Sequence, residues 1–172
     1  MSAADLPTCF PAVLDRDTHV LILGSFPGRA SLQAQAYYAH PRNQFWRLLS
    51  ALLQDDLACL PYAGRLARLR AHHFGLWDVF AVCEREGSLD SAIRNATHND
   101  FRWLQTQCPR LRCVAFNGKT AGRHAALFAQ SGFDTIVLPS SSPAHAAMGF
   151  EQKLAAWRSI CAAESTNPGA PR

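Results

Sequence analysis

The sequence predicts an α/β protein, a three-layer αβα sandwich around a central, mostly parallel sheet of four strands. Two observations favour this class. Short apolar runs rich in β-branched residues alternate along the chain with segments whose apolar residues recur at helical spacing. Strands separated by helices need crossover connections, which set the strands in parallel and place helices on both faces of the sheet.

The first predicted strand covers residues 19–23 (HVLIL), an apolar run that ends at Gly24. A helix follows over 43–53, where apolar residues return every three or four positions. A second helix over 60–73 carries arginines on the face opposite its leucines. The first half also contains two weaker elements, a strand or buried loop edge over 75–82 and a short helix over 100–107.

The second half repeats the alternation more clearly. It contains predicted strands over 111–116 (LRCVAF) and 135–138 (TIVL), a helix over 119–130 and a last helix over 150–163. Residues 165–172 hold two prolines and a glycine, which predicts a flexible tail.

Length and composition indicate one globular domain, spanning residues 1–172. The chain is 48% hydrophobic and 17% charged, and no run of 18 apolar residues predicts a membrane helix. No basic region precedes the apolar residues at the N-terminus, so we expect no signal peptide and a location in the bacterial cytosol or nucleoid. We expect a cytoplasmic monomer without a membrane partner.

The six cysteines form no C-x-x-C pair, which argues against a zinc ribbon or a clustered iron–sulfur site. We therefore expect reduced thiols, most of them buried, and neither a metal nor another cofactor. The net charge is +4 and arginine far outnumbers lysine. This balance favours an anionic partner, although a GC-rich genome also raises the arginine content.

Ligands of parallel α/β folds bind beyond the carboxyl ends of the strands. Three predicted strands end there in unusual sequences, GSFPG, FNGKT and LPSSSPAH, and residues 75–78 offer a fourth wall. The convergence of these loops predicts a single site. The glycines of GSFPG permit a tight turn and close backbone approach to a ligand, although they also suit an ordinary strand-to-helix turn.

Three common motifs for phosphate binding or nucleophilic catalysis are excluded. The first loop lacks G-x-G-x-x-G, and Ser25 directly follows Gly24, so it is not a nucleophile elbow. The GKT sequence lacks the glycine that a P-loop needs five residues before Gly118, where Cys113 stands. A nucleotide hydrolase is therefore disfavoured.

Several polar and aromatic residues are candidates for nucleic-acid contacts. Asn117 presents an amide that suits the edge of a nucleobase, or it caps a helix. In YYAHPRNQFW, an aromatic ring can stack on an extruded base, His40 or Arg42 can contact phosphate, and Asn43 otherwise caps the following helix. The last loop offers hydroxyl and backbone N–H groups that can hold phosphate oxygens, or it is a plain polar connection. Its candidate residues are Ser140, Ser141, Ser142, Pro143 and His145.

Together these blocks resemble the uracil-DNA glycosylase superfamily. The A-H-P-x-N-x-F-W block is shared with its mismatch-specific branch, whose first loop reads G-I-N-P-G and whose loop asparagine holds the hydrolytic water. Phe26 stands at that position here. This departure, with the YYAHP and SSSPAHA sequences, is most similar to the hypoxanthine-DNA glycosylase family, which relies instead on the asparagine of the A-H-P-x-N block.

The resemblance implies a role for each matching residue. Asn43 is the catalytic asparagine, Tyr38 stacks on the base, Asn117 contacts it, and the loop at 140–145 enters the duplex. Ser25 and Phe26 shape the base pocket, and Arg42 and Lys119 contact phosphate.

The implied reaction is hydrolysis of the N-glycosidic bond of a flipped hypoxanthine, or of uracil or xanthine, in double- or single-stranded DNA. Asp78 is the only carboxylate in a predicted site loop, so it acts as general base or stabilises the sugar cation, unless it is merely salt-bridged. Lys119 is the one candidate left for Schiff-base chemistry, and a monofunctional enzyme is the simpler interpretation. The alternatives are a uracil or G·T/U mismatch glycosylase and a catalytically silent nucleic-acid-binding relative.

Overall fold

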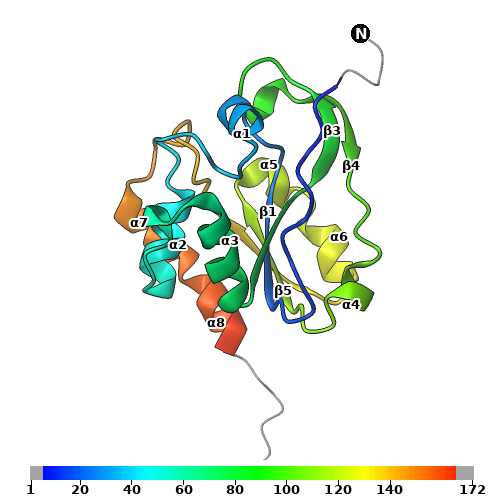
Figure 1. Cartoon of the computed structure of the whole chain (residues 1–172). Coiled ribbons are helices and arrows are strands. Elements are labelled where there is room, and N and C mark those ends of the chain that lie inside the picture. Colours follow the sequence, from blue (N-terminus) through cyan, green and yellow to red (C-terminus); the bar gives the residue numbers. More distant parts are fainter. Residues whose placement is uncertain (1–5, 166–172) are drawn as a thin grey trace, which may run out of the picture.

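The computed structural model describes residues 6–165 and contains the predicted central sheet (Figure 1). Its four strands are all parallel, in the order β2-β1-β5-β6. They are β1 (Val20–Gly24), β2 (Phe74–Asp78), β5 (Cys113–Asn117) and β6 (Asp134–Leu138). The inner strands β1 and β5 are buried along their whole length, as their continuous apolar sequences predict for a sheet covered on both faces.

Successive residues of β1 feed two separate cores because side chains alternate across a strand. Val20 and Ile22 pack into one core, while Leu21 and Leu23 pack into the other. The helices of the first core lie on one side of the sheet in Figure 1: α2 (Phe45–Leu53), α3 (Tyr62–Ala71), α7 (Phe150–Trp157) and α8 (Ser159–Ser165). The helices of the second core are α4 (Leu104–Gln107), α5 (Lys119–Gly122) and α6 (Ala125–Gln130).

The predicted segment 75–82 divides between two sheets. β2 ends at Asp78, and β3 (Phe80–Glu84) leaves the parallel sheet to pair antiparallel with β4 (Arg94–His98). The sequence RNATH of β4 carries no apolar alternation and is largely exposed, so nothing in the pattern predicted this hairpin. α1 (Arg29–Ala34) was also missed, because its six residues, RASLQA, are too short a segment to show helical spacing of the apolar positions.

Two predicted helices are each broken in two. The segment 119–130 forms α5 and α6, and His124 at the break packs its ring against Phe80 and His98, with centroids 5.5 and 4.8 Å apart. The segment 150–163 forms α7 and α8, which meet at Arg158. Two short 3₁₀ turns, η2 (Leu57–Cys59) and η3 (Asp90–Ala92), complete the elements of the described chain.

The predicted tail, 165–172, lies outside the described residues except for Ser165, the last residue of α8. The six cysteines all lie within residues 6–165 and form no disulfide there; Cys83, Cys108 and Cys113 are buried, and Cys59 is exposed. Within residues 6–165, every helix is too short or too polar to cross a membrane.

Candidate active site

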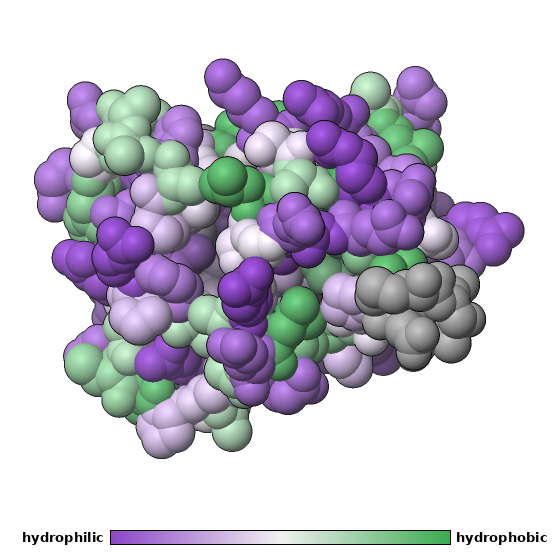
Figure 2. Space-filling view, turned by 90° about the horizontal axis from the view of Figure 1, so that it is seen from above, coloured by the Kyte–Doolittle hydropathy of each residue, from purple (hydrophilic) through white to green (hydrophobic). Residues whose placement is uncertain are grey.

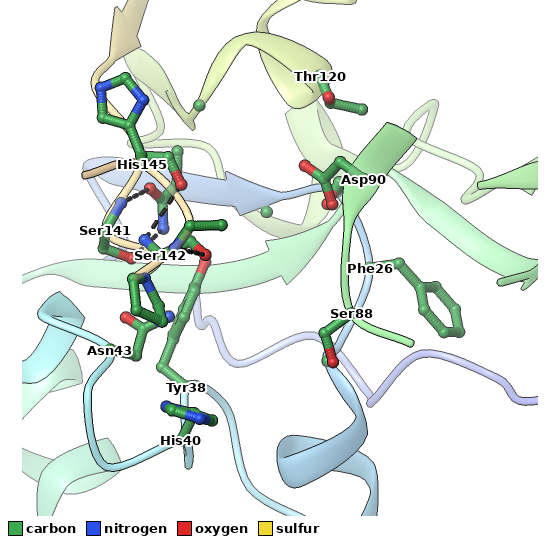
Figure 3. A pocket seen from close by; sticks show the side chains of 18 of the residues that line it. Phe26, Tyr38, His40, Asn43, Ser88, Asp90, Thr120, Ser141, Ser142 and His145 are labelled. Carbon is green, nitrogen blue, oxygen red and sulfur yellow. Dashed lines mark hydrogen bonds between the residues drawn. The ribbon is translucent and has the colours of Figure 1, made fainter. Parts of the chain in front are cut away.

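A cavity of about 750 Å³ lies at the carboxyl ends of the parallel strands (Figure 3). The predicted loops converge on it, as the parallel topology requires. Seen from above, this end of the molecule has a rim of mainly hydrophilic side chains (Figure 2). Among the predicted site residues, those that line the cavity are Ser25, Phe26, Tyr38, His40, Asn43, Asp78, Asn117, Lys119, Ser140, Ser141, Ser142, Pro143 and His145.

Arg42 is the one predicted site residue that does not line the cavity. Its side chain is exposed, and its backbone N–H donates to His40 Nδ1 at 3.1 Å. Lys119 is also exposed, at the first position of α5 beside the cavity. Both cations are therefore placed to contact a ligand from outside and not to reach its buried end.

Tyr38 forms an aromatic wall of the cavity. Its ring stacks on Phe45, with centroids 3.8 Å apart and planes 12° apart. Its backbone adopts the left-handed conformation, with φ +56°, which few residues other than glycine accept. Since one face of the ring is covered by Phe45, the opposite face is the one that a base can stack on.

Asn43 is held at the start of α2 by its own side chain. Its Oδ1 accepts a hydrogen bond from the backbone N–H of Phe45 at 3.0 Å, which closes a turn just before the helix. The N-cap position of α2 is taken by Gln44, so the alternative of Asn43 as the helix cap is wrong by one residue. The same bond orients the amide, which lies beside Tyr38 in Figure 3. Because Oδ1 is engaged, the amide NH2 is the group that remains to donate to a ligand.

Asn117 and Ser141 are joined by two hydrogen bonds. Asn117 Nδ2 donates to Ser141 Oγ, and the backbone N–H of Ser141 donates to Asn117 Oδ1, both at 2.8 Å. This clamp ties the end of β5 to the loop after β6. It corrects two expectations. Asn117 is not a helix cap, since Gly118 occupies that position, and Ser141 is fully buried, so it supports the loop and does not face DNA.

The rest of the serine loop is also braced by its own hydroxyls. Ser140 Oγ accepts from the N–H of Ser142 at 3.1 Å, and Ser142 Oγ accepts from the N–H of Ala144 at 3.2 Å. These backbone donors are therefore occupied within the loop. The hydroxyl protons of Ser140 and Ser142 remain as the donors that a phosphate could use.

Asp78 is buried at the last position of β2 beneath the cavity. Burial raises the pKa of its carboxyl from 3.8 to about 7, against the opposing influence of the Tyr37 hydroxyl and the Arg85 charge. Its Oδ2 has no hydrogen-bond partner of normal geometry among the described residues. Asp78 has no salt bridge there either, so the alternative of a salt-bridged loop residue is wrong.

The first loop presents its backbone to the cavity and turns Phe26 away from it (Figure 3). The Phe26 ring is buried in the second core, with the Arg85 guanidinium 5.4 Å above its centroid. Arg85 also donates to the carbonyl oxygens of Phe26 and Pro27. A base-contacting role for Phe26 would therefore fall to its backbone and not to its ring.

A further wall comes from the connection between β3 and β4, which the sequence did not indicate. It contributes Arg85, Ser88, Leu89 and Asp90 to the cavity. Ser25 Oγ donates to Asp90 Oδ1 at 2.6 Å, and Ser88 Oγ accepts from the N–H of Arg29 at 3.1 Å. The segment EREGSLDS that holds these residues is polar and has no periodic pattern or known motif, so no signal marked them.

Comparisons with known proteins agree with this geometry. Residues 11–161 match the model of the uracil DNA glycosylase superfamily. A protein named hypoxanthine DNA glycosylase from Methanosarcina acetivorans is 46% identical over 136 residues, which are 79% of this chain and 86% of that protein. A protein of the same name from Methanosarcina barkeri is 43% identical over the same shares of both chains. The solution NMR structure of a candidate uracil DNA glycosylase from Methanosarcina acetivorans superposes with a TM-score of 0.79 at 42% identity, over 88% of this chain and 96% of that one.

Proposed function

The chain belongs to the uracil DNA glycosylase superfamily, and on that premise we propose that it removes deaminated bases, hypoxanthine first, from DNA. It does so by hydrolysing the N-glycosidic bond and leaves an abasic sugar. The relatives named hypoxanthine DNA glycosylase support this substrate. The observation that carries the proposal is the cavity of about 750 Å³ with the exposed face of Tyr38 on one side and the Asn43 amide beside it.

The cavity suits a base that has left the helix. A stacked base is shielded, so it must be extruded at a cost of a few kcal/mol, which is lowest for damaged or mispaired bases. Stacking on Tyr38 offsets part of that cost, by about 1–3 kcal/mol per base. The rigid Tyr38–Phe45 stack means that the platform exists before the base arrives.

The polar groups of the cavity suit departure of the base as an anion. Bond breaking develops negative charge on the base and positive charge on the sugar, and fixed hydrogen-bond donors stabilise the first. The Asn43 NH2 is the donor that we assign to the base or to the attacking water. The clamped Asn117 has one amide proton beyond its bond to Ser141, and this proton serves as a second donor.

A monofunctional reaction fits the residues present. Lys119 is the only lysine among the described residues that line the cavity, and it is exposed at the start of α5. A Schiff-base lysine is instead activated by desolvation or a neighbouring cation. We therefore propose hydrolysis by water without a covalent enzyme intermediate.

The test is a panel of labelled oligonucleotides that carry inosine, uracil, xanthine or a T·G mismatch, in single and double strands. Each is incubated with the protein and then treated with alkali, which cleaves abasic sites. We expect cleavage of the inosine strand to be fastest. Binding of the panel without release of any base would overturn the proposal and favour a silent nucleic-acid-binding protein.

A further inference from the structure

Asp90 is a carboxylate at the cavity that the roles assigned so far do not use. Among the described residues that line the cavity, the carboxylates are Asp78 and Asp90. Asp78 is buried, with 3% of its surface exposed, and its Oδ2 is inaccessible to solvent. The Asp90 side chain is 38% exposed. Of the two, only Asp90 can meet both solvent water and a bound substrate.

The Asp90 carboxylate is held in place although its backbone lies in a surface connection. Ser25, itself buried, donates to Asp90 Oδ1 at 2.6 Å. The Arg85 Nη1 atom lies 3.8 Å from the same oxygen, and the Arg85 side chain is only 4% exposed. A fixed donor and a buried cation thus set the position of the carboxylate and balance its charge.

Arg85 connects this carboxylate to the first loop. The same guanidinium donates to the carbonyl oxygens of Phe26 and Pro27 and lies over the Phe26 ring. Asp90 binds Ser25, which directly precedes Phe26 in the chain. The Phe26 side chain itself turns away from the cavity. In this way the β3–β4 connection brings a carboxylate to a loop whose own sequence has none.

We propose that Asp90 is a catalytic residue, whose carboxylate binds the attacking water and accepts its proton. In the close-up of the cavity, the Asp90 carboxylate points from the β3–β4 connection into the space opposite Ser141 and Ser142 (Figure 3). The hydrogen bond from Ser25 and the ion pair with Arg85 both involve Oδ1, so Oδ2 is the oxygen we assign to the water. The inference rests on the proposed glycosylase function.

The step balances without a further reactant. The bond between C1′ and the base nitrogen breaks, and its electron pair leaves with the base. The water oxygen forms the new bond to C1′, and one water proton passes to Asp90. That proton later returns to solvent, and the departed base takes up a proton from solvent. Until the water attacks, the negative charge of Asp90 also stabilises the cationic sugar.

Asp90→Asn is the decisive variant because it keeps the shape of the side chain and its bond from Ser25. We expect its single-turnover release of hypoxanthine to fall about 10²–10⁴-fold, the range typical of a lost general base. Binding to the inosine duplex and the melting temperature should stay close to those of the unaltered protein. Asp100→Asn is the matched control, since it also removes a carboxylate paired with an arginine but lies outside this cavity.

The pH dependence separates catalysis from a structural role. If Asp90 accepts the proton, the single-turnover rate of the unaltered protein declines at acid pH, and Asp90→Asn loses that decline. A variant that excises at the unaltered rate, or one that keeps the acid decline, would overturn the inference. Failure of the unaltered protein to release any base is a different result, because it rejects the proposed function itself.

Discussion

Gly24 and Asp78 face one another across β1 and β2 so closely that a Cβ on Gly24 would lie 2.7 Å from Asp78 Oδ1. The same Cβ would lie 3.0 Å from Tyr38 Oη. The missing side chain of Gly24 therefore allows Asp78 and Tyr38 to lie close to the β1 backbone. Its backbone dihedral is not one that requires glycine, since its φ is not positive.

Gly24→Ala should push Asp78 and Tyr38 apart and reduce excision of hypoxanthine at least tenfold. Overpacking of this kind also costs about 1–3 kcal/mol of stability. The measurements are single-turnover excision and urea unfolding. Gly28→Ala is the matched control in the same loop, because its Cβ would meet Ser88 Oγ at an ordinary 3.5 Å. Equal activity of the two variants would contradict the prediction.

Asn43→Ala should abolish excision and leave binding of the inosine duplex largely intact. It also removes the hydrogen bond from the Phe45 N–H, and the loss of such a bond costs about 1 kcal/mol. Asn43→Asp separates the two effects, since it keeps the acceptor and loses the amide donor. We expect Asn43→Asp to melt like the unaltered protein and still to be inactive. Activity in either variant would reject the catalytic role.

Asp78 should make the protein less stable as the pH rises from 3.8 towards about 7. The pKa of its carboxyl is raised from 3.8 to about 7 by burial, so between these values the native state holds a proton that the unfolded state has lost. The free energy of unfolding contributed by Asp78 is therefore present at acid pH and is lost as the pH rises towards about 7. Asp78→Asn cannot titrate and should lack this dependence.

Urea unfolding of both proteins from about pH 4.5 to about pH 8 measures the difference between their free energies of unfolding. This range covers most of the interval between the two pKa values of Asp78 and extends above it. We expect the stability of the unaltered protein, relative to Asp78→Asn, to decrease with increasing pH. Parallel curves would mean that Asp78 is ionised throughout the range and that its burial is incomplete.

Ser141→Ala should destabilise the protein by about 1–3 kcal/mol, because it leaves the buried amide of Asn117 without its acceptor. Combined with Asn117→Ala in a double-mutant cycle, the two changes should be clearly non-additive, since they remove the same contact. Ser131→Ala is the control, because the Ser131 hydroxyl donates to the Leu127 carbonyl on an exposed helix end. Additive losses would show that the clamp contributes little.

Much of the architecture and the location of the site followed from the sequence. The run HVLIL is apolar on both faces, and only a strand covered on both sides of a sheet accommodates that pattern. Parallel strands bring their carboxyl ends to one edge, which is why Asp78 and Asn117 could be placed at one cavity without coordinates. Asn43 was assigned to the same site by the family resemblance. The family was indicated by short contiguous motifs, which can be recognised without knowing how the chain folds.

The orientation of the side chains depended on contacts between distant segments, which no local pattern encodes. Phe26 stands in a loop that predicts a ligand contact, yet its ring is directed into the second core beneath Arg85. Asp90 lies in a polar segment without periodicity, and its partner Ser25 is 65 residues earlier in the chain. The sequence by itself determined the sheet, the loops at its edge and the family. The tertiary structure alone decided that a second carboxylate, Asp90, lies at the cavity and is open to solvent, because that depends on how the β3–β4 hairpin packs against the first loop.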